Sequence, residues 1–148
     1  MEEGSDVLFG EYFHQIDQKG RVRIPPKLKR ALGESPMVTK GTAGCLFLFS
    51  QSELETTIYD KLQSVPLSDL QASKPLRTLF SSAQELEEDN QGRTMVPKNL
   101  REFAGLTKDI VFLGVGNRAE IWSKEVYEKY IDGVDFDTAI EGLKDYGV

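Results

Sequence analysis

Histidine and cysteine are almost absent from this chain, which has one of each, His14 and Cys45, among its 148 residues. Structural and catalytic zinc sites draw most of their ligands from these two residue types, so we expect no zinc site of the usual kind. A single cysteine cannot form an internal disulfide, which fits a reducing compartment. A nucleophilic site would require His14 and Cys45 to meet in space, whereas the simpler interpretation is a cysteine packed in an apolar strand and a histidine on a strand.

Long apolar runs are also missing, because no stretch approaches the roughly 20 residues of a membrane span. The first six residues are acidic and polar, the opposite of a secretory signal. Neither common glycine-rich phosphate-binding pattern is present. We therefore expect a cytoplasmic protein with no membrane partner, no small-molecule substrate and no cofactor.

The charge is unevenly distributed. A net charge of −6 argues at first against a nucleic-acid partner. Residues 18–33, however, contain six cations and no acid: Lys19, Arg21, Arg23, Lys27, Lys29 and Arg30. The acids gather at residues 85–89 and after Ser123. The pattern is typical of an acidic protein with one dedicated anion-binding face.

One motif occurs twice. Residues 17–25 read Asp-Gln-Lys-Gly-Arg-Val-Arg-Ile-Pro, and residues 89–97 read Asp-Asn-Gln-Gly-Arg-Thr-Met-Val-Pro. Both copies continue alike, to Gly33 and Gly105, and weaker matches follow further on. A repeat this long predicts two related half-domains in tandem. Within a single domain, 1–148, we assign half-repeats to 8–65 and 83–132, a helical bridge to 66–82 and a loosely held acidic tail to 133–148.

Each half predicts a strand, a turn, a strand, a short helix, a hairpin and a longer helix. Asp and Gly suit the first and fourth positions of a tight turn at 17–20 and again at 89–92. The alternation after each turn points Val22, Ile24, Thr94 and Val96 inward, and Arg21, Arg23, Arg93 and Met95 outward. Neither half has enough strands for a core of its own. We therefore expect an α+β fold, one barrel or sandwich in which the halves pack about a pseudo-two-fold axis.

Prolines and glycines mark the predicted helices. Pro25-Pro26 and Pro97 favour helix starts, and Gly33 and Gly105 favour helix ends. The apolar faces of these helices are expected to be Leu28, Ala31 and Leu32, and Leu100, Phe103 and Ala104. Hairpins are predicted from 37–40 with 45–49 and from 110–113 with 118–122, joined by the glycine-rich loops 41–44 and 114–117. A capped helix should follow Ser50, another with Val126 and Tyr130 on one face should follow Ser123, and the bridge should break near Pro75.

The repeated turns are the main candidate site. Turn geometry requires the Asp and the Gly but not the Arg that follows, so repetition of the Arg favours a functional interpretation over a solvated one. An Arg held by a rigid turn suits phosphate or guanine recognition. The predicted DNA-binding residues are Asp17, Lys19, Gly20, Arg21, Arg23, Lys27, Asp89, Gly92 and Arg93.

The two copies of the turn are not expected to contribute equally. The first should dominate because acids surround the second, and Lys19, Lys27 and Lys29 should contact phosphates. A catalytic pair of Asp17 and Asp89 is the disfavoured alternative, because Lys19 and Arg21 surround the first carboxylate.

The paired motif resembles the signature of the bacterial MraZ family, as do residues 9–12, 114–118 and 120–122. The resemblance covers about residues 8–130. It implies an AbrB-like swapped-hairpin (double-split) β-barrel, with DNA-binding roles for Asp17, Arg21, Asp89 and Arg93. It further implies a cytoplasmic, nucleoid-associated transcriptional regulator of the division and cell-wall gene cluster, which assembles into homo-oligomeric rings and binds short G-rich promoter repeats.

From the residues and the resemblance together, we expect a sequence-specific double-stranded DNA-binding regulator and not an enzyme. The alternative is a protein-interaction module of the same fold, of the antitoxin kind. Its distinguishing feature would be a disordered, hydrophobic C-terminal arm, and the tail does contain apolar residues.

Overall fold

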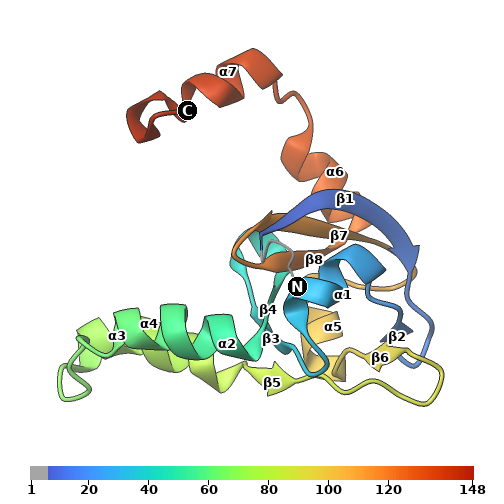
Figure 1. The fold of residues 1–148 in the computed structure, drawn as a ribbon, viewed down its shortest axis with the longest axis horizontal. Coiled ribbons are helices and arrows are strands. Elements are labelled where there is room, and N and C mark those ends of the chain that lie inside the picture. The colour runs from blue at the N-terminus through green and yellow to red at the C-terminus, as the bar shows by residue number, and fades with distance from the viewer. Residues whose placement is uncertain (1–6) are drawn as a thin grey trace, which may run out of the picture.

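The computed structural model describes residues 7–148 and contains a six-stranded antiparallel sheet (Figure 1). In spatial order, its strands are β1 (Leu8–Gln15), β7 (Asp109–Gly116), β8 (Ala119–Ser123), β4 (Leu46–Phe49), β3 (Met37–Lys40) and β5 (Gln84–Glu85). Two short strands, β2 (Arg21–Val22) and β6 (Thr94–Met95), form a separate antiparallel pair. No helix among residues 7–148 combines the length and the apolar character needed to cross a membrane.

The two halves of the chain interleave. Strand β1 of the first half pairs along its whole length with β7 of the second, and β5 of the second half pairs with β3 of the first. In the small sheet Val22 pairs with Thr94, which occupies the same place in the repeat. Exchanging the halves therefore maps the strand order onto itself, as the predicted pseudo-two-fold relation requires.

The predicted mixture of helices and antiparallel strands is confirmed, but the swapped-hairpin barrel that the resemblance implies is not confirmed. Among the described residues the six-stranded sheet is open, because its edge strands β1 and β5 do not pair with each other.

Several helical segments surround the sheet. They are α1 (Pro26–Leu32), α5 (Lys98–Ala104), α2 (Gln51–Glu53), the π-helical segment η2 (Leu54–Tyr59), α3 (Asp60–Leu62), α4 (Leu70–Ser81), α6 (Lys124–Ile131) and α7 (Phe136–Glu141), with 3-10 turns η1 (Thr42–Gly44) and η3 (Lys144–Tyr146). Segments α2, η2, α3 and α4 form a helical hairpin that projects from the sheet, which we call the arm (51–81) (Figure 1).

Helices α1 and α5 begin and end as predicted. Each follows a proline, and Gly33 and Gly105 end them with positive φ angles of 84° and 66°. Leu28 and Leu100 are buried at 1% and 0% exposure. The prediction for Phe103 was wrong: its ring is 42% exposed and lies beneath the Lys40 ammonium group instead of in the core.

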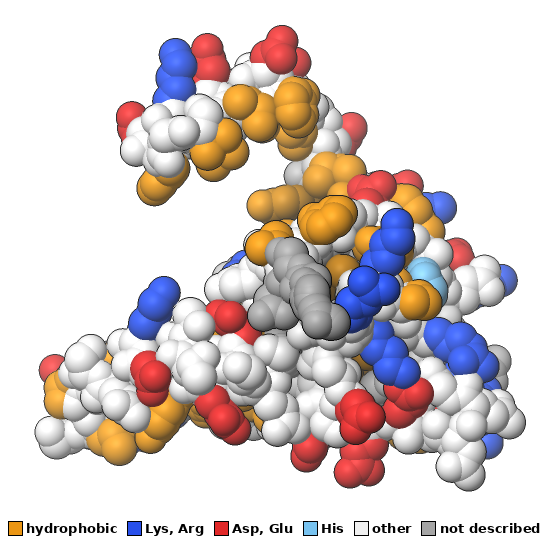
Figure 2. Space-filling view, in the orientation of Figure 1, with side chains coloured by type: hydrophobic (Ala, Val, Ile, Leu, Met, Phe, Trp, Pro, Cys, Tyr) orange, Lys and Arg blue, Asp and Glu red, His pale blue; other side chains and the backbone are white. Residues whose placement is uncertain are grey.

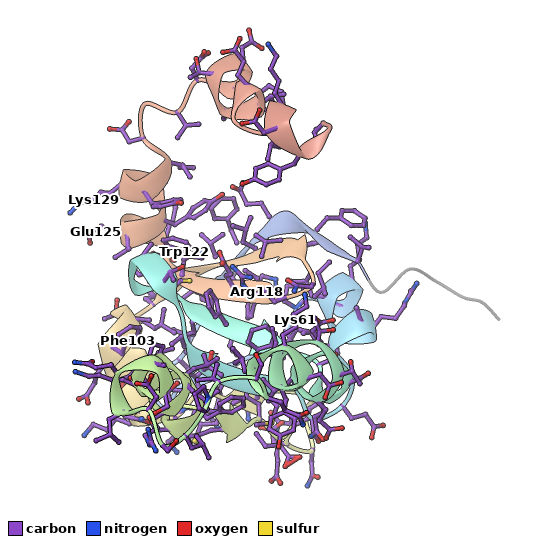
Figure 3. All side chains as sticks on the ribbon, turned by 90° about the vertical axis from the view of Figure 1, so that its left-hand side faces the viewer. Lys61, Phe103, Arg118, Trp122, Glu125 and Lys129 are labelled. Carbon is purple, nitrogen blue, oxygen red and sulfur yellow. The ribbon has the colours of Figure 1, made fainter. Side chains whose placement is uncertain are left out.

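Two cores cover opposite faces of the sheet. The larger contains Val22, Ile24, Val96 and the buried leucines of α1 and α5. The smaller lies under α6 and consists of Cys45, Val111, Trp122 and Tyr127. Figure 3 shows Trp122 beneath α6, with Glu125 and Lys129 pointing outward.

Helix α6 packs through a residue that the sequence interpretation missed. Tyr127 lies against Trp122 and donates a hydrogen bond to Glu11 of β1. Val126 and Tyr130, which we predicted as the packed face, are 36% and 62% exposed, but the Tyr130 ring does lie against Trp122, with 5.0 Å between the ring centroids. The acceptor on β1 explains the difference, because a buried tyrosine hydroxyl is satisfied only where it finds a partner.

Strand β7 is longer than predicted. It continues through Gly116, and only residues 117 and 118 remain as the turn, although 114–117 were expected to form the loop. The strand continues because β1 pairs with it as far as Leu8 opposite Gly116. Glycine is needed at 114, since a Cβ atom there would lie 2.3 Å from the Phe9 nitrogen.

The predicted break at Pro75 is also wrong, because α4 runs through it. Asp69 caps the helix by accepting from the N–H groups of Gln71 and Ala72 at 3.1 and 3.0 Å. Pro75 has no backbone N–H, so the Gln71 carbonyl loses its donor within the helix. Gln71 is exposed, so water can replace the lost hydrogen bond.

The tail (133–148) contains α7 and η3, which the sequence did not predict. Every residue from 133 to 148 is exposed, so the tail does not pack against the body (Figure 1).

Candidate nucleic-acid interface

The first Asp–Arg turn is held by its own aspartate. One carboxylate oxygen of Asp17 accepts hydrogen bonds from the backbone N–H groups of Lys19 and Arg21 at 2.9 and 2.8 Å. The other accepts from Arg21 Nε at 2.7 Å. Gly20 donates to the Asp17 carbonyl at 2.9 Å and has a φ of 85°, which favours glycine. The aspartate therefore holds both the backbone of the turn and the arginine side chain.

The second turn repeats this arrangement. Asp89 accepts from the backbone N–H groups of Gln91 and Arg93 at 2.8 and 2.9 Å. Its other oxygen accepts from Arg93 Nε at 3.3 Å, a longer contact than in the first turn. Gly92 has a φ of 76°. The two turns are thus equivalent down to individual atoms.

Each arginine is fixed through one nitrogen and keeps the others available. The terminal nitrogens of Arg21 and Arg93 make no hydrogen bond with residues 7–148. Their side chains are 31% and 26% exposed. A guanidinium group presented in this way can donate two parallel hydrogen bonds to a phosphate or to a guanine edge.

Both aspartates are held in their charged form. The pKa of Asp17 is lowered mainly by the hydrogen bond from the backbone N–H of Arg21. The Arg21 guanidinium lowers this pKa further. The backbone N–H of Arg93 does the same for the pKa of Asp89. A catalytic dyad that shares a proton has one raised pKa, so these two lowered values contradict the alternative of an Asp17–Asp89 pair.

The pairing of β2 with β6 brings the two turns to one place. Arg21 and Arg93 line a hollow of about 750 Å³ together with Asp17, Arg23 and Lys108. Figure 2 shows Lys and Arg side chains along the right-hand side of the body, above a group of Asp and Glu side chains.

A second hollow adjoins the same two arginines. It measures about 350 Å³ and is also lined by Glu85, Glu87, Glu88 and Asp89. The pair of arginines therefore has a cationic surface on one side and an acidic surface on the other.

The structure places the predicted lysines differently from one another. Lys19 and Lys27 are exposed, but they do not line the cationic hollow. Lys29 forms an ion pair with Glu88, so a phosphate would compete with this carboxylate for the predicted contact. The pair forms because α1 of the first half lies beside the turn of the second.

Arg101 is a residue whose role the sequence interpretation missed. From α5 it donates through Nε to the Val96 carbonyl at 2.9 Å and through Nη1 to the Gln18 carbonyl at 3.4 Å. Arg101 and Lys29 occupy the same place in the repeat, so each half contacts the turn of the other half from its short helix. A cation at this place in both copies was the available signal, whereas nothing in the repeat indicated Lys108.

The only histidine and cysteine do not meet. His14 lines the cationic hollow, which does not include Cys45, and its ring packs edge-on against Phe112. Cys45 is fully buried, and burial raises the pKa of its thiol to about 12. The reactive thiolate is therefore absent at neutral pH.

Comparison with known proteins gives a consistent result. A family model described as "MraZ protein, putative antitoxin-like" matches twice, at residues 7–78 and 79–141. A protein of Clostridium beijerinckii named transcriptional regulator MraZ is 43% identical over 143 residues, covering 96% of this chain and 100% of the relative. Proteins of the same name from Thermoanaerobacter sp. (strain X514) and Carboxydothermus hydrogenoformans are each 44% identical, covering 96% and 86% of this chain and 100% and 88% of the relatives.

Proposed function

This chain belongs to the MraZ family, and from that premise we propose that it is a sequence-specific double-stranded DNA-binding transcriptional regulator. Its relatives are named transcriptional regulators, which supports a role in transcription. The finer statement, that DNA is bound by the repeated turns of a homo-oligomeric ring, rests on the geometry and on the resemblance of the motifs. No catalytic role is assigned.

The observation that carries the proposal is the matched pair of Asp–Arg turns. Two arginines, each held at Nε by its own aspartate, line one hollow in equivalent positions of the repeat. Preformed donors lose less conformational freedom on binding than mobile side chains, which favours specific recognition. In this proposal Arg21 and Arg93 contact base edges, and Gly20 and Gly92 permit the turns.

The charges around the two turns indicate how much each turn contributes to DNA affinity. Lys19, Arg23 and Lys27 contact phosphates around the first turn. Both arginines adjoin the hollow lined by Glu85, Glu87 and Glu88, but these acids directly precede only the second turn in the chain, where they repel the DNA backbone. Arg21 therefore contributes more to affinity than Arg93.

We propose the finer features of the architecture on the same basis. The exchange of β1 and β5 between the halves supports an AbrB-like swapped-hairpin barrel formed by half-repeats 8–65 and 83–132. The bridge (66–82) and the acidic tail (133–148) lie outside this barrel. The regulator acts in the cytoplasm, associated with the nucleoid, on repeated promoter boxes upstream of the division and cell-wall genes.

A gel-shift titration across a salt series tests the proposal. The probes are duplex DNA from the region upstream of the protein's own gene and a scrambled duplex of equal composition. The native probe should bind tighter at every salt concentration. Lys19→Ala and Lys27→Ala should each lower the slope of log affinity against log salt by about 1 without changing the preference. Equal affinity for both probes would contradict the proposal.

One observation favours a second candidate, a protein-interaction module of the antitoxin kind. The tail exposes large apolar side chains, including Phe136 and Tyr146, as a segment that captures another protein would. Removal of residues 133–148 separates the two functions: DNA binding by the turns should persist, whereas capture of a partner protein should be lost.

A further inference from the structure

Two of the uncovered apolar surfaces among residues 7–148 lie on the tail and on the arm, and the first is on the tail. Its exposed apolar side chains are Val134, Phe136, Ile140, Leu143, Tyr146 and Val148. Phe136 and Tyr146 are 74% and 81% exposed. Isolated helices shorter than about 12–15 residues are marginal in water. Helix α7 has six residues, so packing against another surface would stabilise it.

The second surface is a groove on the arm. A hollow of about 210 Å³ lies between its two helical segments, lined mainly by Tyr59, Leu62, Val65, Leu67, Leu76 and Phe80. Tyr59 and Phe80 meet edge to face at 6.4 Å, yet Tyr59 is 50% exposed and Leu67 is 60% exposed. Figure 2 shows hydrophobic side chains along the lower side of the arm and of the tail.

Helix α4, which forms one wall of the groove, and the tail carry opposite charges. Helix α4 carries Lys74 and Arg77 and no acid, and neither forms an ion pair with a carboxylate of residues 7–148. The rest of the arm carries four acids, Glu53, Glu55, Asp60 and Asp69, and one cation, Lys61. Residues 132–148 contain one cation, Lys144, and five acids, Asp132, Asp135, Asp137, Glu141 and Asp145. Attraction between these groups favours the pairing of tail and groove over that of tail and tail.

We propose that the tail of one copy of this chain docks in the arm groove of a second copy. The tail and the arm lie apart in both Figure 1 and Figure 3, so the structure leaves both surfaces free for another molecule. Phe136 and Tyr146 can bury about 150–250 Å² each. Together they would supply about half of the ~800 Å² that each partner buries in a stable interface.

The proposed interface joins two different surfaces, so each copy keeps one free tail and one free groove after the first contact. Head-to-tail contacts of this kind repeat until they close into a ring or extend as a filament. The inference does not rest on DNA binding. It provides a contact for the self-association that the proposed function assumes.

The mass of the full-length protein in the absence of DNA, measured by sedimentation, tests the inference. A tail variant, Phe136→Ser/Tyr146→Ser, and a groove variant, Tyr59→Ser/Leu67→Ser, change exposed side chains, so circular dichroism should show unchanged folding. Each should sediment as a monomer at a concentration where the wild type forms larger assemblies. Phe9→Ser is the control, because Phe9 is 68% exposed on β1, outside both surfaces, and it should assemble like the wild type.

Mixing the two variants distinguishes this interface from others. One intact tail and one intact groove remain in the mixture, so a one-to-one heterodimer should form and grow no further. A tail-to-tail contact would not be restored by mixing, and absence of the heterodimer would overturn the inference. A monomeric wild type, as expected if the tail folds onto its own arm or binds an unrelated protein, would overturn it too. Failure of the DNA proposal would appear separately, as loss of probe preference with assembly intact.

Discussion

Each Asp–Arg pair fixes an arginine through Nε and leaves its terminal nitrogens free. A free arginine side chain has about 2 kcal/mol of rotamer entropy to lose, and the aspartate removes part of that cost before DNA arrives. The first pair is closer, at 2.7 Å against 3.3 Å, and only the second pair directly follows the acids Glu85, Glu87 and Glu88 in the chain. These differences at single residues are the reason to rank Arg21 above Arg93.

The lowered pKa values of Asp17 and Asp89 predict a dependence of stability on pH. Because the folded pKa is below the unfolded value of about 3.9, each carboxylate stabilises the fold fully above that pH. This contribution is lost as the pH falls through the folded pKa. Asp17→Asn should therefore lower the free energy of unfolding by a constant amount between about pH 5 and pH 7, where the carboxylate is charged in both states, and by less at lower pH.

Urea denaturation over this pH range measures the effect. Asp137→Asn is the control, because Asp137 is an exposed tail residue whose side chain makes no hydrogen bond with residues 7–148, and it should change nothing. A loss in Asp17→Asn that stays constant down to the lowest pH would contradict the assignment.

Cys45 should be chemically inert in the folded protein. Its side chain is fully buried and burial raises its pKa to about 12, so a thiol reagent at pH 8 should react only as fast as the chain unfolds. Cys45→Ser should leave DNA binding unchanged and cost about 1–3 kcal/mol of stability, because it places a hydroxyl group in an apolar core. Rapid labelling of the native protein, or loss of DNA binding at normal stability, would reopen the nucleophile hypothesis.

At the scale of elements, the sequence predicted correctly those features that depend on neighbouring residues in the chain. The turns, the proline starts and glycine ends of α1 and α5, and the inward places of Val22 and Val96 follow from side chains within a few residues. The errors have distant causes. Strand β7 is lengthened by its pairing with β1, and Tyr127 is buried where Glu11 accepts its hydrogen bond. Both contacts join the two halves.

Gly20 tests how closely the first turn is packed. A Cβ atom at this position would lie 2.5 Å from Arg101 Nε and 2.8 Å from the Val96 carbonyl, and the φ of 85° is itself unfavourable for alanine. Gly105 has a φ of 66° and nothing within 4 Å, so Gly105→Ala measures the cost of the backbone conformation alone. That cost should be about 1–2 kcal/mol.

Gly20→Ala should cost more, and it should also weaken DNA binding, because the turn must move away from Val96. Urea denaturation of both variants gives the comparison. Equal losses of stability would show that the turn has room to adjust and that Arg101 does not hold it.

At the scale of the whole molecule, the interleaved halves place the two Asp–Arg turns on one surface, and the proposed contact between tail and groove would repeat that surface. One subunit presents a small cationic hollow on an acidic protein, so its own affinity for DNA should be low. Repetition at fixed spacing raises the effective concentration of each further contact, for a gain of roughly 10²–10⁴ in avidity.

Affinity should therefore rise steeply from DNA with one binding box to DNA with several. It should fall when half a helical turn is inserted between boxes, because the insertion points one box away from the protein. Fluorescence anisotropy with matched duplexes gives both comparisons. Equal binding to one box and to several, or an insertion without effect, would contradict the multivalent mechanism.

The affinity of Arg21→Ala for the protein's own upstream DNA tests the central claim most directly. The variant should fold normally, since Arg21 is a partly exposed turn residue, and should lose about 1–3 kcal/mol of specific binding per subunit, the value of one bidentate base contact. Arg93→Ala should lose less. Arg30→Ala removes the same charge from an exposed position on α1 outside the hollow and should keep its preference for the native sequence. Wild-type affinity and preference in Arg21→Ala would contradict the assignment of the repeated turn as the DNA-reading element.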